Sequence, residues 1–219
     1  IAEIILIDAK KTHVWKPLLH EIAAGSLNPD KDELEYLAQA HWHHFKFRYG
    51  RVNEVDSQNK TVSIEPTYDI DGAEIIPLRK IKYDTLVLSV GSTVNDFNIP
   101  GAKEFAVALD TQDQAERFHQ KLHNSILRAQ TQKGSVRPGQ LEVVIVGGGA
   151  TGVELAAELH KATREMTAYG LDRVNPDRDI SISLVEASNR LLPALPVKIS
   201  TSVESELRKL NVKLFLGER

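Results

Sequence analysis

A glycine-rich segment between a strand pattern and a helix pattern is the feature that most constrains this chain. Residues 143–146 are an unbroken aliphatic run, residues 147–152 read GGGATG, and residues 153–167 have the composition of a helix. A G-x-G-x-x-G pattern alone is a weak signal. Directly after a strand and before a helix, it is typical of the turn that binds the pyrophosphate of a dinucleotide. The chain is therefore predicted to contain an α/β dinucleotide-binding fold.

Each glycine of this segment has a predicted role. Gly147 would permit the tight turn, Gly149 would let the pyrophosphate approach the backbone, and Gly152 would let helix and strand pack closely. Gly148 and Thr151 complete the predicted cofactor-binding set, since the phosphates would sit at the positive end of the helix that starts near Thr151. The alternative interpretation is a tight strand-to-helix connection that binds nothing.

An acidic residue completes this pattern at the end of the next predicted strand. Residues 180–185 read as a strand, and Glu186 follows where the ribose hydroxyls of the dinucleotide would be held. A carboxylate there would repel a 2′-phosphate, which favours NAD(H) over NADP(H), although Arg190 could accommodate that phosphate. Glu186 lies further from the glycines than usual because the helix is long and residues 172–179 are inserted. The alternative is an ordinary surface acid at a strand end.

Asp8 occupies the same kind of position near the start of the chain. It ends the aliphatic run of residues 4–7, where a second dinucleotide fold would place its ribose-binding acid. The glycine turn of that fold would then lie before residue 1; the alternative role for Asp8 is a loop cap. The expected fold class is α/β, with two Rossmann-like dinucleotide-binding folds that are both incomplete in this chain.

The remaining patterns outline the other elements. Thr111 and Gln114 form a predicted capping box that starts a helix. Alternating strand and helix patterns after residue 140 predict a parallel sheet with right-handed crossovers. Four further segments are expected to be regular: a helix over 32–40, strands over 47–55 and 61–64, and a strongly apolar strand over 83–90.

Composition excludes several functional classes. With 30 acidic and 27 basic residues the formal net charge is −3, which disfavours nucleic acid as a partner. The absence of cysteine excludes disulfides, thiolate metal sites and cysteine redox chemistry within these residues. His41, His43 and His44 surround Trp42, but without other clustered ligands no metal site is expected. No initiator methionine is present, and the chain closes on a strand pattern, so we interpret it as a fragment.

With both acids placed, the sequence resembles the type II NADH:quinone oxidoreductases over essentially its whole length. Besides Asp8, the segments that carry the resemblance are HVWKPLLH at 13–20, AAGSL at 23–27, GRVNEVD at 50–56, YDTLVLSVGS at 83–92 and VGGGATGVELAAEL at 146–159. Flavin disulfide reductases share this layout but carry a cysteine pair shortly after the acid equivalent to Asp8, where this chain has none.

The resemblance implies a flavoprotein that binds FAD and NAD, with the NAD fold inserted in the FAD fold. It implies a partial FAD-binding domain over 1–110 and an NAD-binding domain over 111–219. Asp8 would hold the adenosine ribose of FAD, and the backbone at Val52 would meet the adenine. Glu154 would be the catalytic acid near the nicotinamide and quinone pocket. The residues expected beside the flavin are Lys16, Pro17, Gly91 and Ser92.

The implied reaction is hydride transfer from NADH to FAD, followed by two-electron reduction of a membrane quinone. The parent enzyme would be peripheral at the cytoplasmic face of the inner membrane, held by segments outside this chain, and a homodimer is left open. The 219-residue fragment itself would be soluble and inactive alone. The alternatives are a soluble flavin NADH reductase that feeds ferredoxin or rubredoxin, and a non-catalytic NAD-binding fragment.

Overall fold

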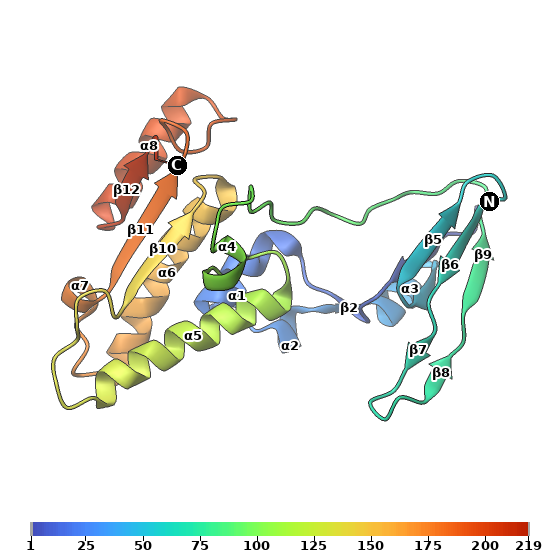
Figure 1. Cartoon of the computed structure of the whole chain (residues 1–219), viewed down its shortest axis with the longest axis horizontal. Helices are drawn as coiled ribbons and strands as arrows, with labels where there is room; N and C mark the ends of the chain where they lie inside the picture. The colour runs from blue at the N-terminus through green and yellow to red at the C-terminus, as the bar shows by residue number, and fades with distance from the viewer. Residues whose placement is uncertain (1, 219) are drawn as a thin grey trace. The chain divides into compact units, whose positions relative to one another are not determined.

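The computed structural model describes residues 2–218 and contains two packing units (Figure 1). The first ends at Val14 and resumes over Asp32–Thr93; the second comprises Trp15–Lys31 and continues from Val94. This division by packing does not coincide with the boundary after residue 110. The assignment of 1–110 to FAD binding and of 111–219 to NAD binding therefore stays a prediction.

In the first unit the aliphatic run near the start is a parallel strand. β1 (Ile5–Asp8) pairs in parallel with β4 (Lys46–Tyr49), and β2 (Thr12–His13) pairs antiparallel with β3 (Leu34–Glu35). The helix α3 (Tyr36–His43) directly precedes β4. The strand that ends at Asp8 is thus confirmed, although its side chains are half-buried instead of fully enclosed.

A small antiparallel sheet fills the rest of the first unit. Its order is β5 (Val52–Asp56), β6 (Thr61–Ile64) and β9 (Arg79–Lys82), and Val62 and Ile64 of the central strand are buried. The hairpin of β7 (Thr67–Tyr68) and β8 (Glu74–Ile76) leads from β6 to β9.

Three predictions for this unit were wrong in part or in whole. Residues 83–90 form no strand, and Val87 and Leu88 are 78% and 67% exposed, because among the described residues no neighbouring strand takes up their backbone hydrogen bonds. The predicted strand over 47–55 is broken at Gly50 and Arg51 into β4 and β5. The predicted helix over 32–40 starts only at Tyr36, after the short strand β3.

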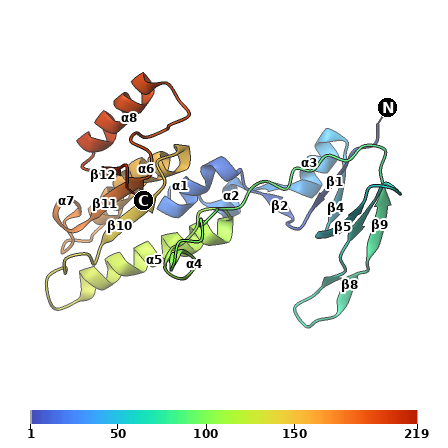
Figure 2. The ribbon, with the colours of Figure 1, turned by 45° about the horizontal axis from the view of Figure 1, so that its top comes forward.

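In the second unit a long helix packs against a short one. The turn η1 (Lys16–Leu18) leads into α1 (Leu19–Ala24), which is followed by α2 (Pro29–Asp32), α4 (Ala102–Phe105) and α5 (Gln112–Thr131). The predicted capping box is confirmed, since Thr111 Oγ1 accepts from the Gln114 N–H while the Gln114 side chain accepts from the Thr111 N–H. Figure 2 shows α1 beside both α5 and α6.

The predicted parallel sheet is confirmed in the second unit. β10 (Glu142–Val146), β11 (Ser181–Glu186) and β12 (Lys213–Leu216) pair in parallel in that order. The connections are α6 (Ala150–Ala168) with α7 (Pro176–Asp179), and then α8 (Val197–Lys209). The α/β class of the prediction is therefore confirmed.

β10 differs from expectation in its burial. It was predicted to be a buried strand, yet only Ile145 is buried, and Val144 and Val146 are 56% and 79% exposed. The reason is that β10 is the edge strand and α6 covers one face of the sheet. None of the helices in residues 2–218 is both long and apolar enough to cross a membrane.

Candidate dinucleotide site

The glycine-rich turn joins the carboxyl end of β10 to the amino end of α6. Gly147 has φ +110°, a value that side chains rarely tolerate, and its N–H donates to the carbonyl of Val185 at 2.8 Å. Gly149 is the N-cap of α6, so the helix begins at Ala150, before the predicted position near Thr151. The turn therefore presents the positive end of a 19-residue helix at the edge of the sheet.

Space around the glycines differs from one to the next. A Cβ on Gly152 would lie 2.0 Å from the carbonyl oxygen of Gly147, so α6 and the turn approach too closely for any side chain. A Cβ on Gly148 would meet Leu191 at 2.6 Å. A Cβ on Gly149 would meet nothing within 4 Å, and Gly149 and Thr151 are both exposed. The surface at Gly149 is both exposed and clear of neighbouring atoms, which fits the approach of a pyrophosphate.

Glu186 lies beside this turn at the carboxyl end of β11. Its Oε2 accepts from the Gly148 N–H at 2.6 Å and its Oε1 accepts from the Ser188 N–H at 2.7 Å. Burial acts to raise the pKa of Glu186, but these hydrogen bonds outweigh it and lower the pKa below its ordinary value. The carboxylate is therefore ionised at neutral pH and held in one orientation, with lone pairs left for further donors.

Arg190 does not point to this carboxylate. Its guanidinium donates to the carbonyls of Leu195 at 2.8 Å and of Pro193, and to the Ser200 hydroxyl at 2.8 Å. These bonds fasten the loop after β11, and the Leu192 N–H fastens the loop to the turn by donating to the Gly148 carbonyl. Arg190 is thus bonded within its own loop, and it does not neutralise the negative charge of Glu186.

Another group of predicted residues meets at the start of α1. Lys16 forms an ion pair with Asp110, which also accepts from the Val94 N–H at 3.1 Å. Pro17 lies in η1, and its carbonyl is 2.8 Å from His20 Nδ1. The same nitrogen is 3.6 Å from Glu154 Oε2, so Glu154 lies next to the Lys16–Pro17 turn. The sequence does not single out Asp110 and His20 as site residues, because only the packing of α1 against α5 and α6 brings them to this place.

The other predicted residues lie in the first unit and are described there by themselves. Asp8 Oδ1 accepts from the Lys10 N–H at 2.8 Å, and Asp8 Oδ2 accepts from the Tyr36 hydroxyl at 3.1 Å. Burial, together with the charge of Asp8, raises the pKa of Tyr36 to about 12. Val52 is 40% exposed at the start of β5; Gly91, with φ +72°, and Ser92 lie in an exposed segment without regular structure. Tyr36 was also missed from sequence.

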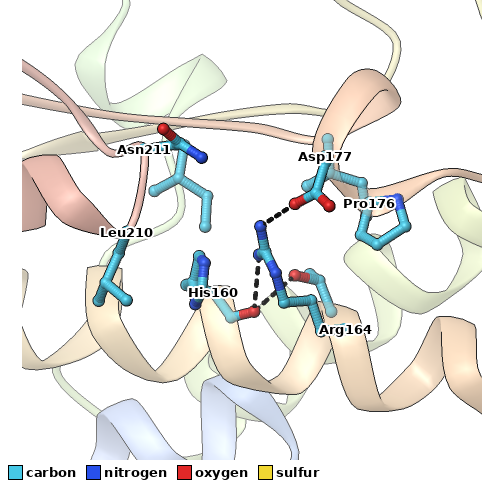
Figure 3. Close-up of a pocket in the computed structure, with 9 residues that line it drawn as sticks. His160, Arg164, Pro176, Asp177, Leu210 and Asn211 are labelled. Carbon is cyan, nitrogen blue, oxygen red and sulfur yellow. Dashed lines mark hydrogen bonds and ion pairs between the residues drawn. The ribbon is translucent and has the colours of Figure 1, made fainter.

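A small cavity of about 30 Å³ lies at the other end of the parallel sheet, between α6, α7, β11 and the turn that precedes β12 (Figure 3). Arg164 reaches across it to Asp177, and its guanidinium also donates to the His160 carbonyl at 3.2 Å. Its volume suits about one water molecule. The residues around this cavity therefore anchor the inserted segment 172–179 to α6. No group of three or more potential metal ligands occurs in residues 2–218.

Comparison with known proteins identifies the family. The family model for pyridine nucleotide-disulphide oxidoreductases matches residues 2–219. The chain belongs to this family. It is 37% identical to a type II NADH:quinone oxidoreductase of Haemophilus influenzae over 99% of the chain and 51% of that protein, and 26% identical to the Mycobacterium tuberculosis type II NADH:quinone oxidoreductase NdhA over 98% and 44%. The predicted resemblance is confirmed.

Solved structures of the oxidoreductase family show the same fold. NDH2 from Plasmodium falciparum in complex with NADH superimposes with a TM-score of 0.79 at 24% identity, over 98% of this chain and 43% of that chain. The chain thus spans about half the length of the relatives it matches. The open surface at Gly149 and the fixed carboxylate of Glu186 lie together at the carboxyl edge of the sheet in this shared fold.

Proposed function

We propose that these residues form the NADH-binding and part of the flavin-binding region of a type II NADH:quinone oxidoreductase. The observation that carries the proposal is Glu186, which two backbone N–H groups orient beside the glycine turn. The 37% identity to the Haemophilus influenzae enzyme over 99% of the chain supports the same function.

NADH would bind across the carboxyl edge of β10 and β11. Its pyrophosphate would rest on the open surface at Gly149 and on the N–H groups of the first turn of α6, which have no partner within the helix. The adenosine ribose hydroxyls would donate to the Glu186 carboxylate. A 2′-phosphate would meet that carboxylate without the Arg190 guanidinium between them, because Arg190 is bonded to its own loop. We therefore propose NADH as the reductant.

FAD is the proposed second cofactor, held through Asp8 and Val52 on its adenosine side and through the Lys16–Pro17 turn, Gly91 and Ser92 on its flavin side. A bound flavin would supply the redox chemistry between NADH and a quinone. Asp110 fixes the ammonium group of Lys16, and the Tyr36 hydroxyl fixes Asp8. Both contacts restrict the side chains before any cofactor binds.

Glu154 is the proposed catalytic residue. Its side chain is 51% exposed in the second turn of α6, close to Pro17, so it could reach a reacting acceptor while staying in contact with water. A carboxyl group so placed would hold a proton for the acceptor as that acceptor becomes reduced. The proposed acceptor is a membrane quinone, and we propose that the full-length enzyme attaches peripherally to the membrane. A homodimer is left open.

The test compares electron acceptors in a full-length, flavin-loaded enzyme that carries this sequence. NADH oxidation should be fast with a quinone in lipid vesicles and slow with ferredoxin or rubredoxin. Glu154→Gln should lower the quinone reductase rate about 100-fold, the usual effect of removing a general acid, while NADH binding is unchanged. Turnover with the iron proteins but not with quinone would contradict the proposal. The 219-residue chain alone, even with FAD added, is expected to show no turnover.

A further inference from the structure

His20 has contacts that the proposed function does not yet use. It lies in the first turn of α1, directly after the Lys16–Pro17 turn, and its side chain is only 12% exposed. α1 packs against α6 (Figure 2), and the Ser26 hydroxyl, just beyond α1, donates to Glu158 Oε1 on α6 at 2.5 Å. The backbone around His20 is therefore held against the helix that carries Glu154.

The hydrogen bond to Pro17 locates one hydrogen on the ring. A carbonyl oxygen only accepts, so the Nδ1 atom, 2.8 Å from the Pro17 oxygen, carries a hydrogen. The same nitrogen faces Glu154 Oε2 at 3.6 Å, whereas Nε2 faces Glu21 Oε1 at 3.9 Å. One N–H group thus points at a carbonyl of the predicted flavin turn and lies next to the predicted catalytic carboxylate.

We propose that His20 is a positioning residue for Glu154. Its ring is fastened to the Pro17 carbonyl through Nδ1–H, and the same positive edge of the ring lies 3.6 Å from Glu154 Oε2, so it attracts the carboxyl group to a place beside the Lys16–Pro17 turn. Glu154 is half exposed and otherwise free to change rotamer, so a contact of this kind decides how often the carboxyl group faces the acceptor. This inference rests on the proposed catalytic role of Glu154.

Three substitutions of His20 separate the effect of its Nδ1–H group from the effect of simple packing. In His20→Asn the side-chain amide nitrogen takes the place of Nδ1 and can still donate. In His20→Gln the amide nitrogen lies closer to the place of Nε2. His20→Leu has no donor. In the full-length flavin-loaded enzyme, His20→Leu should lower kcat for quinone reduction about 10-fold with KM for NADH unchanged, because misplacing a reacting group by about 1 Å can cost up to ~100-fold. His20→Asn should restore most of the rate and His20→Gln should not.

A double variant tests whether His20 acts through Glu154. In the Glu154→Gln background, His20→Leu should change kcat less than about 2-fold, since residues that act as a unit are not additive. An equal loss in both backgrounds would overturn the proposal, and so would a His20→Leu enzyme with unchanged kcat. If Glu154→Gln itself leaves the quinone reductase rate intact, the proposed function of Glu154 fails instead.

A spectroscopic readout does not depend on activity or on the folding of the leucine variant. Nitrogen NMR of histidine-labelled full-length enzyme should show His20 with its hydrogen on Nδ1, and Glu154→Gln should shift the Nδ1 resonance. His123 on α5 serves as the control and should not respond. A His20 with its hydrogen on Nε2 alone, or with an Nδ1 resonance that ignores Glu154→Gln, would contradict the contact.

Discussion

Gly149 and Gly152 stand three residues apart, yet a methyl group would have opposite consequences at the two positions. At Gly152 it would lie 2.0 Å from the Gly147 carbonyl oxygen, and at Gly149 it would touch nothing within 4 Å. Gly152→Ala should therefore destabilise the second unit by about 3 kcal/mol or more through overpacking. Gly149→Ala should change the free energy of unfolding by no more than about 1 kcal/mol, the range for an N-cap substitution.

The same pair should separate stability from binding. Gly149→Ala should weaken NADH binding about 10-fold or more, because the methyl group occupies the surface on which the pyrophosphate lies and a charge-assisted hydrogen bond contributes about 1.5–3 kcal/mol. Urea denaturation gives the stabilities, and calorimetric titration gives the affinities. A Gly149→Ala chain that binds NADH normally would show that the pyrophosphate does not lie there.

Tyr36 makes the stability of the first unit fall as pH rises through the alkaline range. Its folded pKa of about 12 exceeds the ordinary value of 10.0, so its contribution is complete below pH 10 and is lost as pH rises from 10 to 12. Tyr36→Phe removes the hydrogen bond to Asp8 and should cost about 1 kcal/mol at pH 7, after allowance for partial exposure. Denaturation at pH 8, 10 and 12 should show that the phenylalanine variant lacks this loss. Equal alkaline destabilisation of both proteins would contradict it.

At the scale of elements, the contact between α1 and α5 depends on a histidine. Gly25 ends α1 with φ +88°, and the His119 ring of α5 lies so close that a Cβ on Gly25 would be 2.3 Å from it. His119 Nδ1 is buried without a hydrogen-bond partner. The His119 ring stacks on the His123 ring with 6.2 Å between the ring centroids. Burial is the main cause that lowers the pKa of His119 below 6.5, and the neighbouring His123 lowers it further. A hydrogen bond with the Ala23 backbone acts in the opposite direction but does not outweigh them.

This shift has a defined sign. The folded state binds the proton on His119 less well than the unfolded state, so the second unit should lose stability as pH falls below 6.5. His160, whose pKa burial also lowers, adds to the effect. Urea denaturation at pH 7.5 and 5.5 should show a smaller acid loss for His119→Gln than for the unaltered chain. An identical loss would show that His119 does not carry it.

Elements with local signals were predictable from sequence, and elements defined by neighbours were not. The capping box at Thr111 and the alternation after residue 140 depend on nearby residues, and both were confirmed. Residues 83–90 have strand composition, but strand structure requires a paired backbone. β9, with its charged Arg79, Lys80 and Lys82, exists because it pairs with β6, and its composition gave little indication of that.

In the molecule as a whole, the candidate site also combines residues that local sequence signals reveal with residues that only long-range packing brings together. The glycine turn and Glu186 follow from their places at strand ends, so sequence was enough to pick them out. The Asp110 carboxylate on Lys16 and the His20 contact with Glu154 join segments far apart in the chain, and they depend on how α1 packs. Sequence reasoning also left open whether Arg190 could accept a 2′-phosphate, which its bonds to the loop now argue against.

Calorimetric titration of the chain with NADH and NADPH measures whether the glycine turn and Glu186 bind NADH. NADH should bind at least about 10-fold more tightly, because a 2′-phosphate within ~4 Å of an ionised carboxylate is repelled by more than that ratio requires. Since the pKa of Glu186 is lowered, the preference should persist at pH 5.5, and Glu186→Gln should narrow it. Equal affinities for NADH and NADPH in the unaltered chain would show that Glu186 does not hold the adenosine ribose.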